Sequence, residues 1–404
     1  MRVRSPWLLL LQAAASLVIL GLVIWKLPTI ETLLRVRPER GNNAAVRIEP
    51  LTPGTWRFIV SGDSRDCGDV VMPAIAAHSL RYAPSFYWHL GDLRAIYKID
   101  EDMEAASANE RQVLTCGAYH RRAWSDFIEN QIAPFGSTPF FVGIGNHEVI
   151  PPKTEEQFSS QFKDWLTSTP LNAQRLEDGE KEPLPPRPYY HWIQGGVDFI
   201  YLDNASGSFS KEQLDWFDRT LAKDEPKNDR VVSLVVGMHE ALPDSIANDH
   251  SMCDDPKKVE GCVSGRHVYD ALLRFQDKKP VYLLASHSHF LMEGIFNNLP
   301  PNRRLPGWIV GTAGAIRYPL PSSPPPSART DVYGYLLGTV QKTGVIQFEF
   351  QEVKEEDVPP SVWQRYPPGL VPWCFAHNSQ NQDPHAEETS HRCTPPAAAA
   401  SHSP

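Results

Sequence analysis

Amide, imidazole and carboxylate side chains follow a short apolar run in the first half of the chain. Residues 140–142 (FFV) favour a buried strand, and the glycines of residues 143–145 (GIG) allow a sharp turn at its end. The polar tripeptide Asn146-His147-Glu148 comes next. Ligands of α/β proteins collect at the carboxyl ends of strands, so this turn is a candidate site. A polar turn after a strand is usually only a turn, and the tripeptide alone decides nothing.

The same layout, an apolar run that ends in polar side chains, recurs along the chain. The other four polar ends are Asp63-Ser64-Arg65 after residues 57–60, Asp92 after residues 85–90, His239 after residues 231–236, and His287-Ser288-His289 after residues 281–285. Together they offer carboxylate, amide and imidazole ligands and no cysteine. This ligand set suits manganese, iron or zinc rather than a metal held by thiolates.

In order and spacing, these polar ends resemble the calcineurin-like metallophosphoesterase superfamily. The pattern of that family is D-x-H, G-D, G-N-H-[DE], a lone His and then G-H-x-H, and the resemblance runs from about Arg57 to about Gly314. The segments 201–204, 213–217 and 311–315 are also similar to the purple-acid-phosphatase-like branch. The resemblance implies an α/β fold in which two sheets form a sandwich flanked by helices.

The resemblance also implies roles for individual residues. Asp92 would bridge two metal ions, with Asn146, His239 and His287 completing one site and Asp63 and His289 belonging to the other. His147 would act on the leaving group without binding metal, oriented by Glu148. Asn146 and His147 would contact the substrate, and Arg65, which the family pattern does not contain, is a third candidate contact because of its guanidinium. The expected cofactors are two ions of iron, manganese or zinc, and the expected reaction is hydrolysis of a phosphoester by metal-activated water.

Two residues depart from the family pattern. Arg65 stands where the family has its first histidine, and an arginine has no lone pair to give a metal. Its guanidinium could instead hold a phosphate oxygen through two parallel hydrogen bonds, so we expect the Asp63/His289 site to be the weaker one. Purple acid phosphatases carry a tyrosine ligand where this chain has Ala95, and Tyr97 is the candidate replacement.

Two other functions stay open on the sequence. One is a phosphodiesterase or nuclease of the same fold, and the other is a metal-binding interaction domain that has lost catalysis. Arg65 favours the second alternative, whereas His147 argues against it. A net charge of -9 speaks against non-specific binding to nucleic acid. The resemblance implies that a small phosphoester is the partner. The sequence does not indicate the oligomeric state.

The N-terminus is predicted to anchor the protein in a membrane. Residues 7–27 are mostly apolar, and their core would span about 28 Å as a helix, close to the hydrocarbon thickness. Residues 1–6 would form a short cytoplasmic tail with Arg2 and Arg4, and residues 28–50 a stalk. A cleaved signal sequence, with Ala13–Ala15 near the cleavage site, is the alternative.

Six cysteines bear on where the protein is located. An even count in an exported chain favours disulfides and therefore a catalytic domain outside the cytoplasm, periplasmic or extracellular. Proximity along the sequence favours the pairs Cys67–Cys116, Cys253–Cys262 and Cys374–Cys393. Six unpaired cysteines in a cytoplasmic protein are the alternative.

Residues 51–355 are long enough for one large domain. Expected elements are helices over 70–82, 99–114 and 210–221, a hairpin over 189–203, and strands over 333–340 and 345–350. Residues 151–188 are interpreted as an insertion over the rim of the site. The Pro- and Ala-rich residues 356–404 are expected to be mostly disordered. His78, His89, His191 and His267 are interpreted as core histidines.

Overall fold

The computed structural model describes residues 51–224, 230–255, 257–378 and 393. The expected cytoplasmic tail (1–6), membrane anchor (7–27) and stalk (28–50) lie outside the described residues. Among the helices of the described part, none combines the length and the apolar character needed to cross a membrane.

Two mixed sheets form the centre of the fold. One sheet has the strand order β11-β10-β1-β2-β3, and the other has the order β4-β5-β6-β7-β9-β8. The strands are β1 (Trp56–Ser61), β2 (Tyr87–His89), β3 (Phe140–Val142), β4 (Tyr190–Gln194), β5 (Val197–Leu202), β6 (Ser233–Met238), β7 (Val281–Ala285), β8 (Leu291–Glu293), β9 (Gly307–Val310), β10 (Tyr333–Val340) and β11 (Ile346–Val353). Strands β1, β2 and β3 run parallel, as do β5, β6, β7 and β9. The parallel strands of each sheet therefore end at one edge of it.

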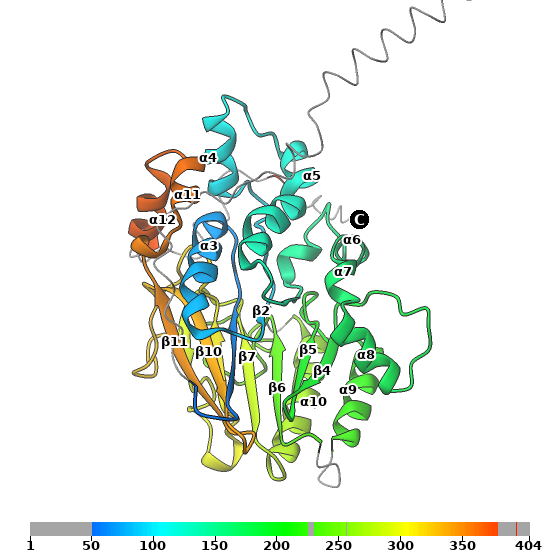
Figure 1. The fold of residues 1–404 in the computed structure, drawn as a ribbon. Helices are drawn as coiled ribbons and strands as arrows, with labels where there is room; N and C mark the ends of the chain where they lie inside the picture. Colours follow the sequence, from blue (N-terminus) through cyan, green and yellow to red (C-terminus); the bar gives the residue numbers. More distant parts are fainter. Residues whose placement is uncertain (1–50, 225–229, 256, 379–392, 394–404) are drawn as a thin grey trace, which may run out of the picture. The chain divides into compact units, whose positions relative to one another are not determined.

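Helices cover the outer faces of both sheets (Figure 1). The α-helices are α3 (Gly68–Ser79), α4 (Glu101–Asn109), α5 (Cys116–Phe127), α6 (Glu155–Gln161), α7 (Lys163–Leu166), α8 (Thr169–Glu177), α9 (Lys211–Lys223), α10 (Val259–Gln276), α11 (Pro360–Arg365) and α12 (Leu370–Asn378). Helices α3 and α5 pack on the first sheet, and α9 and α10 pack on the second. The apolar faces of these helices pack against the sheets. The polar strand ends are therefore carried by a packed, rigid frame.

Aromatic side chains fill the space between the two sheets. The ring of Phe141 on β3 stacks on Trp192 of β4 with centroids 3.9 Å apart. Phe58 and Phe86 each meet Phe199 of β5 edge to face, at 5.0 and 5.1 Å. Such pairs stabilise a core beyond the area they bury. The predicted α/β sandwich of two sheets flanked by helices is therefore confirmed.

Several local predictions match the structure closely. Strands β4 and β5 form the expected antiparallel hairpin, with both turn glycines, Gly195 and Gly196, at positive φ. Ser210 caps α9 by accepting a hydrogen bond from the backbone N–H of Gln213. Strands β10 and β11 begin and end within three residues of the expected ranges. Hydrophobic alternation and capping residues are local signals, which is why they identified these elements.

The folded domain extends beyond the predicted boundary at residue 355, and this boundary is wrong. Helices α11 and α12 follow it and lie beside α3 in Figure 1. The side chains of Val362 and Tyr366 are buried, and Tyr366 Oη donates to Asp69 Oδ2 of α3 at 2.8 Å. The Pro- and Ala-rich composition of the whole segment concealed the few apolar residues that dock. Residues 379–392 and 394–404 lie outside the described part.

The disulfides are Cys67–Cys374, Cys116–Cys393 and Cys253–Cys262. The predicted pair Cys253–Cys262 is confirmed, whereas the predicted pairs Cys67–Cys116 and Cys374–Cys393 are wrong. The two long-range bridges join cysteines that are 307 and 277 residues apart. Sequence proximity failed there because α12 lies against the start of α3 and Cys393 lies against the start of α5.

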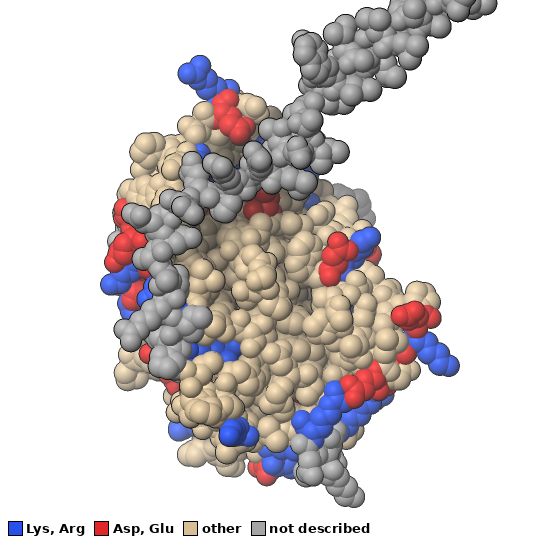
Figure 2. Space-filling view, viewed as in Figure 1, with Lys and Arg blue, Asp and Glu red and all other residues tan. Residues whose placement is uncertain are grey.

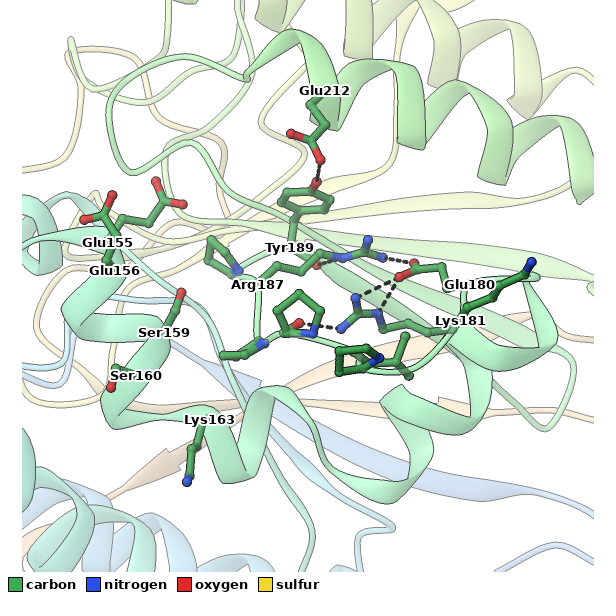
Figure 3. A pocket seen from close by; sticks show the side chains of 16 residues that line it. Glu155, Glu156, Ser159, Ser160, Lys163, Glu180, Lys181, Arg187, Tyr189 and Glu212 are labelled. Carbon is green, nitrogen blue, oxygen red and sulfur yellow. Dashed lines mark hydrogen bonds and ion pairs between the residues drawn. The ribbon is translucent and has the colours of Figure 1, made fainter.

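Residues 151–188 contribute to the core and to a surface hollow. Phe158 and Phe162 are buried against Trp124 of α5, so this aromatic stripe is part of the core. A hollow of about 820 Å³ lies beside the Pro-rich residues 183–188. Figure 3 shows its mixed lining, in which Glu180 forms ion pairs with two arginines and Tyr189 bonds Glu212. None of the predicted metal ligands lines this hollow.

The four expected core histidines differ in their surroundings. His89 and His191 are buried, and His78 is half-buried against the hydroxyl of Tyr335. The interpretation of His267 as a core residue is wrong, because its side chain is 41% exposed and pairs with Asp218. Helix α10 turns this residue toward solvent.

On the face drawn in Figure 2, charged side chains of both signs lie mainly around the periphery of the described surface.

Candidate metal centre

The five polar strand ends meet in space. Asp63 follows β1, Asp92 follows β2, Asn146 and His147 follow β3, His239 follows β6, and His287 and His289 follow β7. Three of these residues, Asp63, Asp92 and His287, have left-handed backbones with φ of 58°, 59° and 67°. Such a conformation costs about 1–3 kcal/mol at a non-glycine residue, so the surrounding fold must impose it. Backbone strain of this kind clusters at functional sites.

Gly145 shows how tightly the strand ends pack. A Cβ atom at this position would lie 2.3 Å from Oδ1 of Asp92 and 2.9 Å from the ring of His239. These are closer than real contacts of a Cβ atom. The glycine of this motif is therefore required by the approach of two predicted ligands, in addition to any need for a turn.

Four side chains converge at a first metal position, formed by Asp92, Asn146, His239 and His287. Around Nε2 of His239 lie Asn146 Oδ1 at 3.0 Å, His287 Nδ1 at 3.1 Å and Asp92 Oδ1 at 3.2 Å. Ligands about 2.1 Å from a common ion are separated by about 3 Å when they subtend a right angle at it. The four atoms therefore have the spacing of a coordination shell.

The other ring nitrogen of His239 fixes its tautomer. Nδ1 lies 3.0 Å from the carbonyl oxygen of Leu90 and 3.0 Å from Oγ of Ser286. Because a carbonyl only accepts, Nδ1 carries a proton, so Nε2 is the ring nitrogen left to bind an ion. A partner of this kind behind the ring is the usual support of a metal-binding histidine.

Two buried carboxylate oxygens point to a cation. Oδ1 of Asp63 and Oδ2 of Asp92 make no hydrogen bond to any described residue, although both side chains are at most 1% exposed. A buried carboxylate oxygen without a partner is costly unless a positive charge is nearby. Neither oxygen is among the four atoms of the first position, since Asp63 Oδ1 lies 3.4 Å from Nε2 of His289 and Asp92 Oδ2 lies 4.0 Å from Nε of Arg65. The donor set of carboxylate, amide and imidazole atoms is what fits a metal ion at the first position.

A second position is formed by Asp63, Asp92 and His289, with Asp92 shared between the two positions. By distance alone these three residues could also hold an ion. Arg65 lies there, however, with its side chain 2% exposed. Its Nη2 is 3.0 Å from Nε2 of His289, and its Nε is 4.0 Å from Oδ2 of Asp92.

A solved structure similar to this chain supports its fold. A purple acid phosphatase from yellow lupin (Lupinus luteus) seeds has a TM-score of 0.51 and 15% identity, covering 74% of this chain and 52% of its own. PhoD (TM-score 0.43, 15% identity) covers 76% and 72%, and 5'-nucleotidase from Candida albicans (0.37, 12%) covers 83% and 60%. The chain thus spans about half the length of the lupin protein. No family model and no curated protein matches the sequence.

The chain has the calcineurin-like metallophosphoesterase fold. The predicted resemblance is thereby confirmed at the level of the fold. In this fold the strands that precede the predicted metal ligands end close to one another, which brings the ligands together.

Glu148 has a different role from the expected one. Its carboxylate accepts hydrogen bonds from the backbone N–H groups of Asp92, Leu93 and Gly145 at 2.8–3.0 Å. It therefore fixes the loop that carries Asp92. Glu148 was expected to orient His147, but that histidine is held instead by the carbonyl oxygen of Ala95, 2.6 Å from Nδ1 of His147. Burial raises the pKa of Glu148 to about 8.

His147 faces the centre of the candidate metal site without belonging to either group of potential ligands. Its Nε2 lies 3.5 Å from Oδ2 of Asp92, on the side opposite the bond from Nδ1 to Ala95. Burial lowers the pKa of His147 to about 4, against the opposing influence of Asp92. This pKa is lower than the near-neutral value expected of a general acid.

Tyr97, the candidate replacement ligand, contacts Arg65 in the structure. Its hydroxyl accepts a hydrogen bond from Nη1 of Arg65 at 3.1 Å, and its ring lies 5.3 Å from that of His147.

The sequence did not single out Tyr318, which accepts from Nη2 of Arg65 at 3.1 Å and stacks on His289 at 3.9 Å. Tyr318 follows the last motif by 29 positions, so no spacing rule identified it. The ring of His250 lies 5.3 Å from that of His287, and this residue was also missed because it belongs to none of the five motifs.

Proposed function

We propose that this protein is a metal-dependent hydrolase of phosphoesters. The observation that carries the proposal is the convergence of ligand atoms from four side chains on one point, those of Asp92, Asn146, His239 and His287. The metallophosphoesterase fold of the chain supports the same conclusion. The expected substrate is a small phosphoester.

When bound at this position, a metal ion supplies Lewis acidity that activates water and draws charge from a phosphoryl oxygen. Asn146 contributes a neutral carbonyl oxygen, which limits the negative charge that an anionic substrate meets. Once its ring is protonated, His147 would donate a proton from Nε2 to the leaving oxygen, while Nδ1 is held by the carbonyl oxygen of Ala95. Because burial lowers the pKa of His147, the charge of a bound phosphoryl group must raise it before the ring can donate near neutral pH.

The test is hydrolysis of p-nitrophenyl phosphate and bis-p-nitrophenyl phosphate by dialysed protein to which Mn²⁺, Zn²⁺ or Fe²⁺ is returned. We expect metal-dependent release of nitrophenol, and loss of that activity in His287→Ala. Exposed His267 pairs with Asp218, and His267→Ala is the matched control, expected to keep the activity. Faster turnover of the diester than of the monoester would favour the phosphodiesterase or nuclease alternative.

A second candidate function is a metal-binding interaction domain without catalysis. The position of Arg65 beside His289 favours it, because the family pattern places a metal ligand there. Metal binding without hydrolysis of either nitrophenyl substrate would decide for this candidate and against the hydrolase.

The proposal includes a membrane-anchored protein whose catalytic domain lies outside the cytoplasm. All six cysteines are paired in disulfides, which form and persist in oxidising compartments. Protease added to spheroplasts should digest the domain, and thiol labelling of denatured, unreduced protein should find almost no free thiols. Six reactive thiols per chain would place the domain in a reducing compartment instead.

A further inference from the structure

The guanidinium of Arg65 is built into the metal centre by three side chains. Nη1 donates to Oη of Tyr97 at 3.1 Å, and Nη2 donates to Oη of Tyr318 at 3.1 Å and lies 3.0 Å from Nε2 of His289. The side chain is 2% exposed. An arginine held at three points in a buried site has little freedom to leave it.

The proton positions on His289 follow from its partners. Nδ1 is 2.6 Å from the carbonyl oxygen of Ile316, which only accepts, so Nδ1 carries the proton. A guanidinium only donates, so Nε2 must accept from Nη2 of Arg65. The one lone pair that His289 could offer to an ion is therefore already used by Arg65.

An ion and this guanidinium compete for the same space. Metal ions bind histidine nitrogen at about 2.0–2.1 Å, whereas Nη2 of Arg65 lies 3.0 Å from Nε2 along the same lone pair. An ion at that distance would overlap the guanidinium and be repelled by its charge. The second position therefore does not fit a metal ion while Arg65 remains in place.

The first position is free of this conflict. The four ligand atoms around it come from Asp92, Asn146, His239 and His287, and no described arginine or lysine bonds any of these atoms. The guanidinium supplies at the second position one positive charge beside the carboxylates of Asp63 and Asp92. It thus replaces part of the charge that a second ion would bring.

We propose that the protein binds a single metal ion, at Asp92, Asn146, His239 and His287, and that Arg65 takes the place of the second ion. This inference deepens the proposed function, because it specifies the centre with which that hydrolase would work. In such a centre, His289 and Tyr318 position the guanidinium, and His289 binds no metal.

The test counts ions in the full-length protein, purified in detergent, saturated with Mn²⁺ or Zn²⁺ and freed of excess metal by gel filtration. Metal per chain is measured by mass spectrometry of the digested sample. We expect about one ion in the wild type and about one in His289→Ala, because this histidine is not a ligand. His287→Ala should fall toward zero, and Arg65→His should rise toward two.

Arg266→His controls for the added imidazole, since Arg266 is an exposed arginine paired with Asp244, and it should keep one ion. Thermal unfolding of each variant shows whether it is folded. Two ions in the wild type, falling to one in His289→Ala, would overturn the inference, and so would a wild type that binds none.

The count does not depend on turnover, so the two proposals can fail separately. One ion per chain without hydrolysis of any phosphoester would contradict the proposed function and leave the single-ion centre intact. Two ions per chain with hydrolysis would uphold the function and refute the role of Arg65.

Discussion

Nδ1 of His147 lies 2.6 Å from the carbonyl oxygen of Ala95, and this contact turns Nε2 toward Oδ2 of Asp92, 3.5 Å away. The imidazole is therefore held in one orientation by the backbone of the loop that carries Asp92. It faces Asp92 from outside both groups of potential ligands. In the proposed hydrolase this geometry would separate proton transfer by His147 from metal binding and make the two roles experimentally distinct.

On this basis His147→Ala should lower kcat by about 10²- to 10⁴-fold, the usual contribution of a general acid. Metal per chain should stay at the wild-type value, because His147 is not a ligand. Steady-state kinetics with p-nitrophenyl phosphate and metal analysis on the same sample give both numbers. A variant that has lost its metal would show that His147 is a ligand and not the acid.

Arg94 is enclosed by carboxylates in the interior. It forms ion pairs with Asp69, Asp102 and Asp126, is fully buried, and has Asp100 4.0 Å away. Removing the cation from such a group leaves buried charges uncompensated, which destabilises a protein by about 3–5 kcal/mol. We expect this loss in the free energy of unfolding for Arg94→Met, measured by urea denaturation.

Lys211→Met is the matched control for that experiment. Lys211 pairs with Asp215 on the surface, where its side chain is 85% exposed. Exposed pairs contribute about 0–1 kcal/mol, so this variant should unfold almost as the wild type does. Equal effects of the two substitutions would show that the buried cluster is not a stabilising element.

The disulfide Cys67–Cys374 joins the loop after Arg65 to α12, across 307 residues. A cross-link that closes a long loop restricts the unfolded chain more than one that closes a short loop, and native disulfides contribute about 2–5 kcal/mol. Replacing both cysteines by serine should lower the free energy of unfolding by an amount in this range. The double substitution at Cys253 and Cys262, only 9 residues apart, should have a smaller effect. The reverse order in denaturant titrations would contradict this account.

The sequence predicted what depends on local pattern. Apolar runs that end in Asp, Asn or His identified all five strand ends, and Ser210 before an amphipathic segment located the start of α9. It did not predict contacts between distant residues, such as Cys67 with Cys374 or Arg65 with Tyr318.

Glu148 shows the same limit at short range. Its place beside His147 in the motif suggested that it orients this histidine, yet its carboxylate bonds backbone amides of the Asp92 loop. The register of β2 against β3 brings that loop within reach, and no spacing within one motif encodes it. The sequence thus indicated which residues gather at the centre, and the packing of the strands decided how each one is used.

His191 of β4 lies between two carboxylates in the interior. Nε2 is 2.6 Å from Asp178 and Nδ1 is 2.9 Å from Asp198, and the side chain is 3% exposed. Burial alone would lower the pKa of His191, but Asp198 and then Asp178 outweigh it and raise the pKa to about 10. The ring is therefore a cation at neutral pH, and both of its N–H groups donate.

This raised pKa makes the stability of the protein dependent on pH in a definite direction. An unfolded chain has a histidine pKa of about 6.5, so the stabilisation by His191 is complete below that pH and is lost as the pH rises to about 10. Between these values the free energy of unfolding of the wild type should fall relative to His191→Gln, by at most about 1.4 kcal/mol per pH unit. Urea titrations at pH 6, 7.5, 9 and 10 measure this difference. His267→Gln is the control, since it removes an exposed pair with Asp218 and should leave the free energy of unfolding close to that of the wild type. A difference between wild type and His191→Gln that stays constant over this range would mean that His191 is neutral in the folded protein.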